Sequence, residues 1–375
     1  MPWLQRAIVC GSVLTAGSAF TQFTATTRPA PPCKQIDLPA GEMEPREFVH
    51  ALAEQAGVKF AAELDSDHPV ISPGKTWFWP AILEAAAERD WRLQFSANRY
   101  VFPELLRTLN VDSRQTGLAQ NQWCQFEGYC VQPLVARVSQ LVRTGNATTA
   151  PRMSVGLRLL LDPASHYLYV KRPELRDGVT DTGESLVSAE AADMQQLYNG
   201  LPPRSLDAGS TLTLLQPKKE ATTLAHISGR ALVGRISRYA HLEMPDPLHA
   251  GIATVQTAWG QVLVRLEQRE MSTRRSFRLT AELRPDKGVR QIDFDILFYH
   301  APGLAELHAA DGTKFNNSYL PEVDSGARPR TVLVRTFSLP TGPSDPGEPA
   351  LLVWDIPIEA QDIVIPFHFS NLPLP

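Results

Sequence analysis

Apolar and polar residues alternate with a period of two through most of the chain from residue 153 onward. In the first such run, apolar side chains recur at every second position, at Val155, Leu157, Leu159 and Leu161. Similar runs follow up to the C-terminus, bounded by Gly, Pro, Asp and Asn. Short strands of this kind are typical of antiparallel sandwiches. Because roughly 220 residues exceed one seven-stranded unit, we predict two immunoglobulin-like β-sandwich domains, at residues 151–248 and 249–375.

The last run, residues 362–369, has the clearest pattern. Its apolar face carries Ile363, Ile365, Phe367 and Phe369. Such a face belongs against a core, so we expect this strand to be integral to the second sandwich. Pro366 has no backbone donor, which predicts an edge position.

Residues 1–32 have the pattern of a signal peptide and tether. Arg6 precedes an uncharged stretch at residues 7–20, and small residues follow at plausible cleavage positions. The alternative is an uncleaved anchor or a buried helix. Residues 21–32 are rich in Thr, Pro and Ala and predict a tether without a core. We therefore expect export to the periplasm or the extracellular side of the cell envelope, with no transmembrane span in the mature chain.

Residues 33–104 predict a small α+β module with the order βαββαββ. Helical periodicity at residues 44–57 places Phe48, Val49, Leu52, Ala53 and Ala56 on one face, and Gly57 is a suitable C-cap. A second helix is expected at residues 76–89, so that two helices lie on one small sheet. Residues 105–150 then predict a linker with a Cys loop and a short amphipathic helix at residues 134–142.

The head of this module, IDLPAGEMEPREFVHALAEQAGVKF, resembles the short N-terminal domain of secretins and TonB-dependent transducers. The resemblance implies a periplasmic protein-docking module, whose partner is another envelope protein. Residues 153–375 contain the segment LAHISGRALVGR, the pair WGQVLVRLEQRE and SFRLTAELRP, and the ending IPFHFSNLPLP. With these segments they resemble a family of uncharacterised exported planctomycete proteins. That second resemblance implies export and a β-sandwich architecture, and it brings no catalytic residue.

The charged residues and cysteines restrict the function further. Lys and Arg number 36 against 40 Asp and Glu, and a net charge of −4 gives no electrostatic basis for nucleic-acid binding. Signal cleavage leaves Cys33, Cys124 and Cys130. In an oxidising compartment Cys124 and Cys130 are predicted to form a disulfide, and the alternative is two unbridged thiols. No histidine lies near them, so we predict no metal site there.

Two groups of residues are candidates for chemistry. Trp77 and Trp79 flank Phe78 at the start of the second helix, and one of them could remain exposed as a contact for a sugar or a protein; the alternative is a core role. Asp293 and Asp295 lie two apart on one strand face, which is more often solvated than catalytic. We predict no catalytic constellation, metal or cofactor, and hence a non-enzymatic binding or structural protein of the envelope. The alternative is a carbohydrate-active or other hydrolytic enzyme that uses the Asp293 and Asp295 carboxylates.

Overall fold

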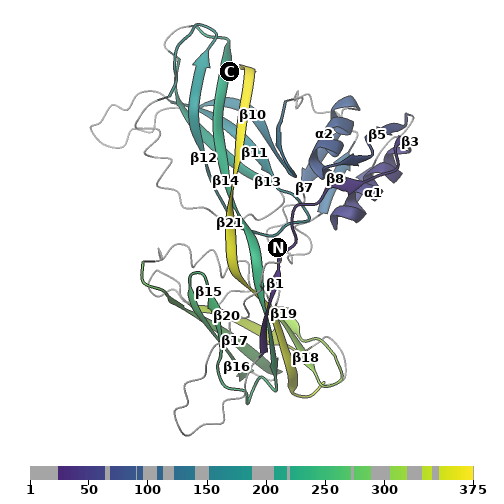
Figure 1. Cartoon of the computed structure of the whole chain (residues 1–375), viewed down its shortest axis with the longest axis vertical. Coiled ribbons are helices and arrows are strands. Elements are labelled where there is room, and N and C mark those ends of the chain that lie inside the picture. The colour runs from purple at the N-terminus through teal and green to yellow at the C-terminus, as the bar shows by residue number, and fades with distance from the viewer. Residues whose placement is uncertain are drawn as a thin grey trace, which may run out of the picture.

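The computed structural model describes residues 24–63, 68–89, 91–95, 108–112, 122–139, 152–187, 207–217, 220–271, 274–288, 305–318, 332–339 and 346–374. The described chain is mostly β, with two helices confined to a small α+β module beside two packed β bodies (Figure 1). This architecture confirms the predicted fold class of a small α+β module followed by β-rich domains. Neither helix, at 12 and 11 residues, is long and apolar enough to cross a bilayer.

The α+β module extends to residue 112, beyond its predicted end at 104. Its elements are β2 (Ile36–Asp37), β3 (Gly41–Met43), α1 (Pro45–Ala56), β4 (Lys59–Glu63), β5 (Val70–Ser72), β6 (Lys75–Thr76), α2 (Phe78–Glu88), β7 (Arg92–Phe95) and β8 (Thr108–Asp112). The strands form three small sheets, β2–β6, β3–β5 and β4–β8–β7, where one sheet was expected. Helix α1 buries the predicted apolar face and ends at Gly57, whose φ of 65° suits a glycine C-cap.

The first sandwich begins in the segment that was predicted to be a linker. One of its sheets has the order β13–β11–β10–β9, built from β9 (Cys124–Phe126), β10 (Tyr129–Ser139), β11 (Arg152–Leu160) and β13 (Asp207–Leu215). The helix predicted at residues 134–142 is wrong, because β10 runs through that segment and pairs with β11. A nine-residue apolar pattern fits a strand as well as a helix, and pairing with a neighbouring strand decides between them.

The second sandwich has a sheet of the order β15–β16–β17–β20–β19. Its strands are β15 (Ala253–Thr257), β16 (Gly260–Met271), β17 (Arg274–Pro285), β19 (Asn316–Ser318) and β20 (Val332–Ser338). The opposing sheet contains β1 (Thr24–Pro29) and β18 (Ala305–Ala309). Part of the predicted tether is therefore a strand: Thr24 pairs with Glu243 and Pro29 with Arg238.

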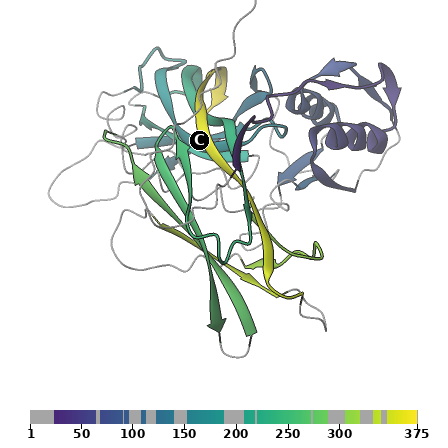
Figure 2. The same cartoon turned by 60° about the horizontal axis from the view of Figure 1, so that its bottom comes forward.

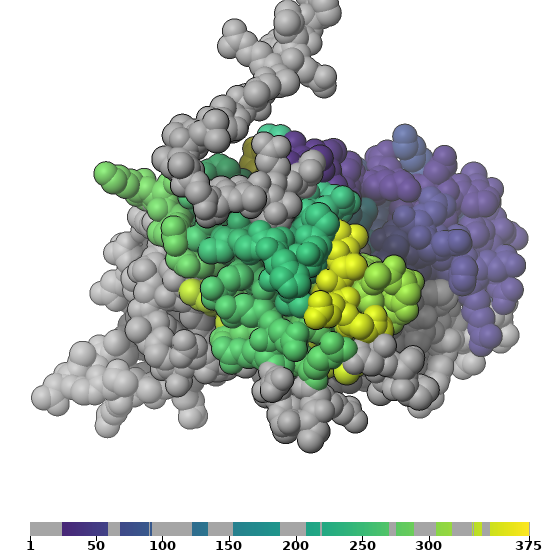
Figure 3. Space-filling model, turned by 90° about the horizontal axis from the view of Figure 1, so that it is seen from below, coloured from purple at the N-terminus to yellow at the C-terminus, as the bar shows by residue number. Residues whose placement is uncertain are grey.

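Two long strands belong to both sandwiches. β14 (Thr223–Pro245) and β21 (Pro349–Pro373) pair along nearly their whole length, and β12 (Tyr167–Thr180) pairs with the first part of β14. Figure 1 shows both strands passing from one body into the other, and Figure 2 shows the same continuity from a second direction. Seen from below, the yellow surface of β21 lies against the green surface of the second sandwich (Figure 3).

Each half of these strands lines a different core. In the second sandwich, Leu242, Met244, Leu352 and Trp354 pack among β15, β16, β17 and β18. In the first, the buried residues of the shared strands are Leu224, Ile227, Ala231, Val233, Ile365, Phe367, Phe369 and Leu372. The register shifts between Ile236 and Tyr239, with one extra residue on each strand. A single extra residue shifts the alternation by one, so the same face of the strand pair lines both cores.

The predicted division of the sandwiches near residue 248 is therefore wrong. The apolar face of residues 363–369 is buried as predicted, but in the first sandwich and not in the second. The edge position predicted for Pro366 agrees with the pairing. The amide of His368 points away from β14, toward Cys124 Sγ, and the nitrogen of Pro366, two residues earlier, faces the same side.

Candidate functional site

Trp79 is an internal anchor. Its side chain is fully buried, and its indole Nε1 donates a hydrogen bond to the backbone oxygen of Leu161, 2.7 Å away, at the end of β11. Phe78 packs edge-on against it, with ring centroids 4.9 Å apart. Trp79 is thus unavailable to a partner, and the core alternative holds for it. Trp77 precedes the helix and is half-buried.

The module and the first sandwich share one core. Cys130 and Leu160 of the sandwich lie in the same buried cluster as Ile36, Phe48 and Trp79. Eight of the eleven residues of α2 are buried, whereas α1 buries six of twelve. A helix buried nearly all round lies between two packed layers. Helix α2 therefore joins the module to the sandwich, and α1 keeps a solvent face.

A second junction surrounds Cys33, at the start of the module. Its Sγ lies 3.4 Å from the hydroxyl of Tyr129, 3.5 Å from that of Ser165, and 3.3 Å from Nη1 of Arg235. These residues come from β10, from the turn after β11 and from β14. The contacts hold the chain between β1 and the module against the first sandwich.

Cys124 and Cys130 are free thiols, so the predicted disulfide is absent. In the β9–β10 hairpin, Cys124 is opposite Val131 and Cys130 is opposite Gln125. Adjacent strand residues point to opposite faces, so Cys124 and Cys130 lie on opposite sides of the hairpin. Cys130 belongs to the module core and Cys124 packs against the sandwich core. Burial raises the pKa of both thiols.

The Cys124 thiol has a different structural role, which is to join two strand edges. Its Sγ accepts a hydrogen bond from the backbone N–H of His368, at 3.2 Å, and donates one to the carbonyl oxygen of the same residue, at 2.8 Å. β9 of one sheet is thereby held beside β21 of the other. The side-chain sulfur occupies part of an edge that would otherwise be open to another strand.

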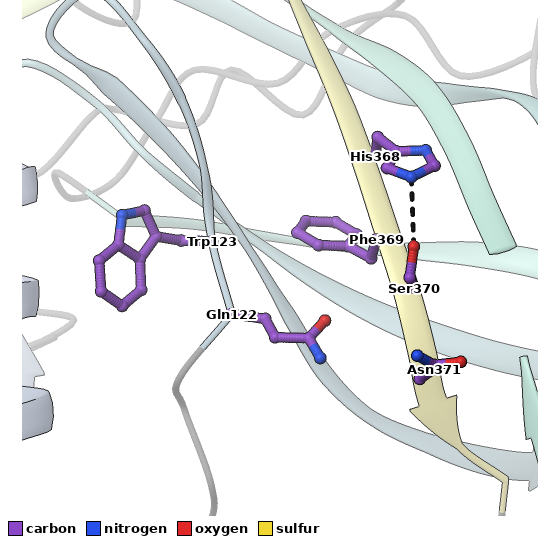
Figure 4. Close-up of a pocket in the computed structure, with 6 residues that line it drawn as sticks. All are labelled: Gln122, Trp123, His368, Phe369, Ser370 and Asn371. Carbon is purple, nitrogen blue, oxygen red and sulfur yellow. Dashed lines mark hydrogen bonds between the residues drawn. The ribbon is translucent and has the colours of Figure 1, made fainter. Parts of the chain in front are cut away.

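A hollow opens beside this contact, between the segment before β9 and the end of β21. It has a volume of about 470 Å³ and is lined by Gln122, Trp123, His368, Phe369, Ser370 and Asn371. Figure 4 shows the Gln122 amide directed toward Ser370 and Asn371, whereas the Trp123 indole turns away from β21. Trp123 packs instead on the module core. The hollow is therefore mainly polar.

A row of polar side chains leads into the hollow across the outer face of the sheet. The Nε2 of His226 lies 3.2 Å from Asp177 Oδ2, and the His226 and His368 rings are 4.4 Å apart between centroids. His368 Nε2 in turn lies 3.2 Å from Ser370 Oγ. Next to Ser370, Asn371 has a φ of 57°, a left-handed conformation uncommon outside glycine. The mutual contacts fix the orientations of His368 and Ser370 at the wall of the hollow.

Among the residues that the structure describes, Asp162 is the one Asp or Glu that is buried. Its side chain is 1% exposed, and a Cβ added at Gly128 would lie 2.1 Å from its Oδ2, so only glycine fits there. Its Oδ1 accepts a hydrogen bond from the backbone N–H of Ala164, at 2.8 Å, while its Oδ2 has no hydrogen-bond partner. Burial raises the pKa of Asp162 to about 6, and backbone amides oppose this only in part.

From this raised pKa we predict how the free energy of unfolding depends on pH. Between pH 3.8 and about 6 the folded carboxyl keeps a proton that the unfolded one has lost, so stability falls as the pH rises through that window. Asp162→Asn should remove about 3 kcal/mol of pH dependence over the whole window, of which about 2 kcal/mol falls between pH 4.5 and 7.5. Urea unfolding at pH 4.5 and 7.5 measures it. Asp286→Asn, at an exposed position, serves as the control and should retain the wild-type dependence; an equal loss in both variants would contradict the assignment.

The other predicted candidates are not placed by the structure. Asp293 and Asp295 lie outside the described residues, as does the signal peptide. Among the residues that the structure describes, no group of three His, Cys, Asp or Glu side chains is placed to hold a metal ion. The hollow was not predicted. Its signal in the sequence is the pair of polar residues His368 and Ser370, opposite the predicted apolar face. Its other wall, Gln122 and Trp123, comes from the distant segment before β9.

No protein-family model, curated protein or solved structure matches this chain.

Proposed function

We propose that this protein is a non-enzymatic binding protein of the cell envelope, in which a rigid two-sandwich body presents the α+β module to another protein. The observation that carries this proposal is the attachment of the module through Trp79 and α2. A module held in this way presents the same surface continuously, so a partner loses little orientational freedom on binding it.

The surface left for a partner is formed by α1 and the β3–β5 ribbon. The exposed residues Arg46, Glu47, His50 and Glu54 lie on the solvent face of α1. Ile71 on β5 is 74% exposed, the highest value among the large apolar side chains that the structure describes. Exposed apolar side chains rimmed by charged ones are common in interfaces between proteins. The resemblance of this module to the docking domain of secretins and TonB-dependent transducers supports the same role, and the signal-peptide pattern in residues 1–32 supports the compartment.

Site-specific photo-cross-linking tests this proposal. A photoreactive amino acid at position 71, introduced in the full chain in its native host, should yield a discrete cross-linked envelope protein. The same residue at position 252, where Ile252 is 52% exposed on the second sandwich, is the matched control and should not yield that product. Equal products at both positions, or none at position 71, would contradict docking through the module.

A further inference from the structure

We infer that the hollow between Gln122 and Asn371 is a binding site for a neutral saccharide, separate from the module's docking surface. The described walls of the hollow carry little charge. Of the six described lining residues, His368 is the one titratable side chain, and none carries a carboxylate, an ammonium or a guanidinium group. Walls of this kind offer a charged ligand few ion pairs.

The walls of the hollow can both donate and accept hydrogen bonds. The Gln122 and Asn371 carboxamides, the Ser370 hydroxyl and the His368 imidazole each supply both a donor and an acceptor. Sugar hydroxyls also donate and accept, so adjacent hydroxyls can pair with several of these side chains at once. Phe369 lies beneath the polar groups and is 3% exposed, which leaves hydrogen bonds and not ring stacking to recognise the ligand.

Several side chains of the hollow are held in place before a ligand arrives. Ser370 is bonded to His368, and His368 packs on His226, which is paired with Asp177. The Cys124 thiol fixes the backbone of His368 from the other side. The left-handed backbone at Asn371 is a further fixed element in the wall. Polar groups that neighbouring residues orient lose less entropy on binding than free ones.

Size sets the scale of the ligand and its affinity. The hollow is wide and open to solvent, and its volume of about 470 Å³ has room for one or two sugar rings that would stay partly exposed. For a single ring bound through hydrogen bonds, a dissociation constant of about 1 mM is expected from typical ligand efficiencies.

Saturation-transfer NMR on the full chain tests the site with glucose, N-acetylglucosamine, cellobiose, chitobiose and glucuronate as probes. At least one neutral sugar should bind saturably, and glucuronate should bind no more tightly than glucose. Gln122→Ala, Ser370→Ala and Asn371→Gly should each weaken binding about fivefold or more. Glycine is chosen at position 371 because it tolerates the observed φ.

The control is Gln261→Ala, which removes an exposed amide from the second sandwich and should leave sugar binding unchanged. Thermal unfolding of each variant shows that the fold is retained. The inference is overturned if no neutral sugar binds at a sugar concentration about ten times the expected dissociation constant. It is also overturned if the three wall variants bind sugar as tightly as the wild type does, or if glucuronate binds most tightly of the five probes. Because the photo-cross-linking at position 71 is a separate experiment, failure here leaves the docking proposal intact.

Discussion

Truncation after Ala360 is expected to unfold the first sandwich and to leave the second one folded. The removed residues include Ile365, Phe367, Phe369 and Leu372, all of which are buried in the core of the first sandwich. At about 1.5–3 kcal/mol for each buried apolar side chain, their loss costs roughly 6–12 kcal/mol, which matches the whole stability of a typical domain. The second sandwich keeps its own part of β21, with Leu352, Trp354 and Ile356 in place.

Limited proteolysis with mass spectrometry measures this outcome. Cleavage in the truncated chain should concentrate in residues 152–187 and 207–217, while residues 253–285 stay as resistant as in the wild type. A chain shortened only by Leu374 and Pro375 is the control and should resist throughout. Early digestion of residues 253–285 with a resistant first sandwich would contradict the shared-strand arrangement.

Trp79→Ala is the second change with a large expected effect. It empties a fully buried site and leaves the carbonyl of Leu161 without its indole partner. Replacing a buried aromatic residue by alanine typically costs about 3–5 kcal/mol, and here the loss falls at the junction of module and sandwich. We therefore expect lower unfolding free energy and faster proteolysis of residues 36–89.

Trp77→Ala is the matched control for this prediction. Trp77 is half-buried and lies outside the shared core cluster, so its replacement should change the unfolding free energy by about 1 kcal/mol or less. Chemical denaturation compares the two variants. Equal effects, or a larger effect for Trp77→Ala, would show that Trp79 does not hold the junction.

The local features of the chain could be predicted because they depend on neighbours in sequence. The apolar face of α1, its end at Gly57 and the buried side of residues 363–369 all follow from periodicity alone. Periodicity tells which side of a strand is buried but not which sheet covers it. The passage of β14 and β21 through both sandwiches depends on their register and on the extra residues near Ile236, which no local pattern reveals.

The functional candidates differ for the same reason. Cys124 and Cys130 are close in sequence, yet the hairpin register places them on opposite faces. Tryptophan is a residue type common in contacts with ligands and partners, but the first sandwich covers α2 and buries Trp79. The walls of the hollow come from segments far apart in the chain, and the Cys124 thiol that bonds to His368 lies 244 positions away from it. Such contacts between distant segments have no signature in either segment alone.

The α+β module is a fixed part of the sandwich body, and a distance distribution between the two tests this attachment most directly. Spin labels carried by unnatural amino acids at positions 71 and 252 leave the native thiols free, and pulsed dipolar spectroscopy then measures the separation of module and second sandwich. In the otherwise wild-type protein we predict a single narrow distribution of label-to-label distances, and we predict that Trp79→Ala broadens it. A broad distribution in the wild-type frame would show a mobile module and contradict the account.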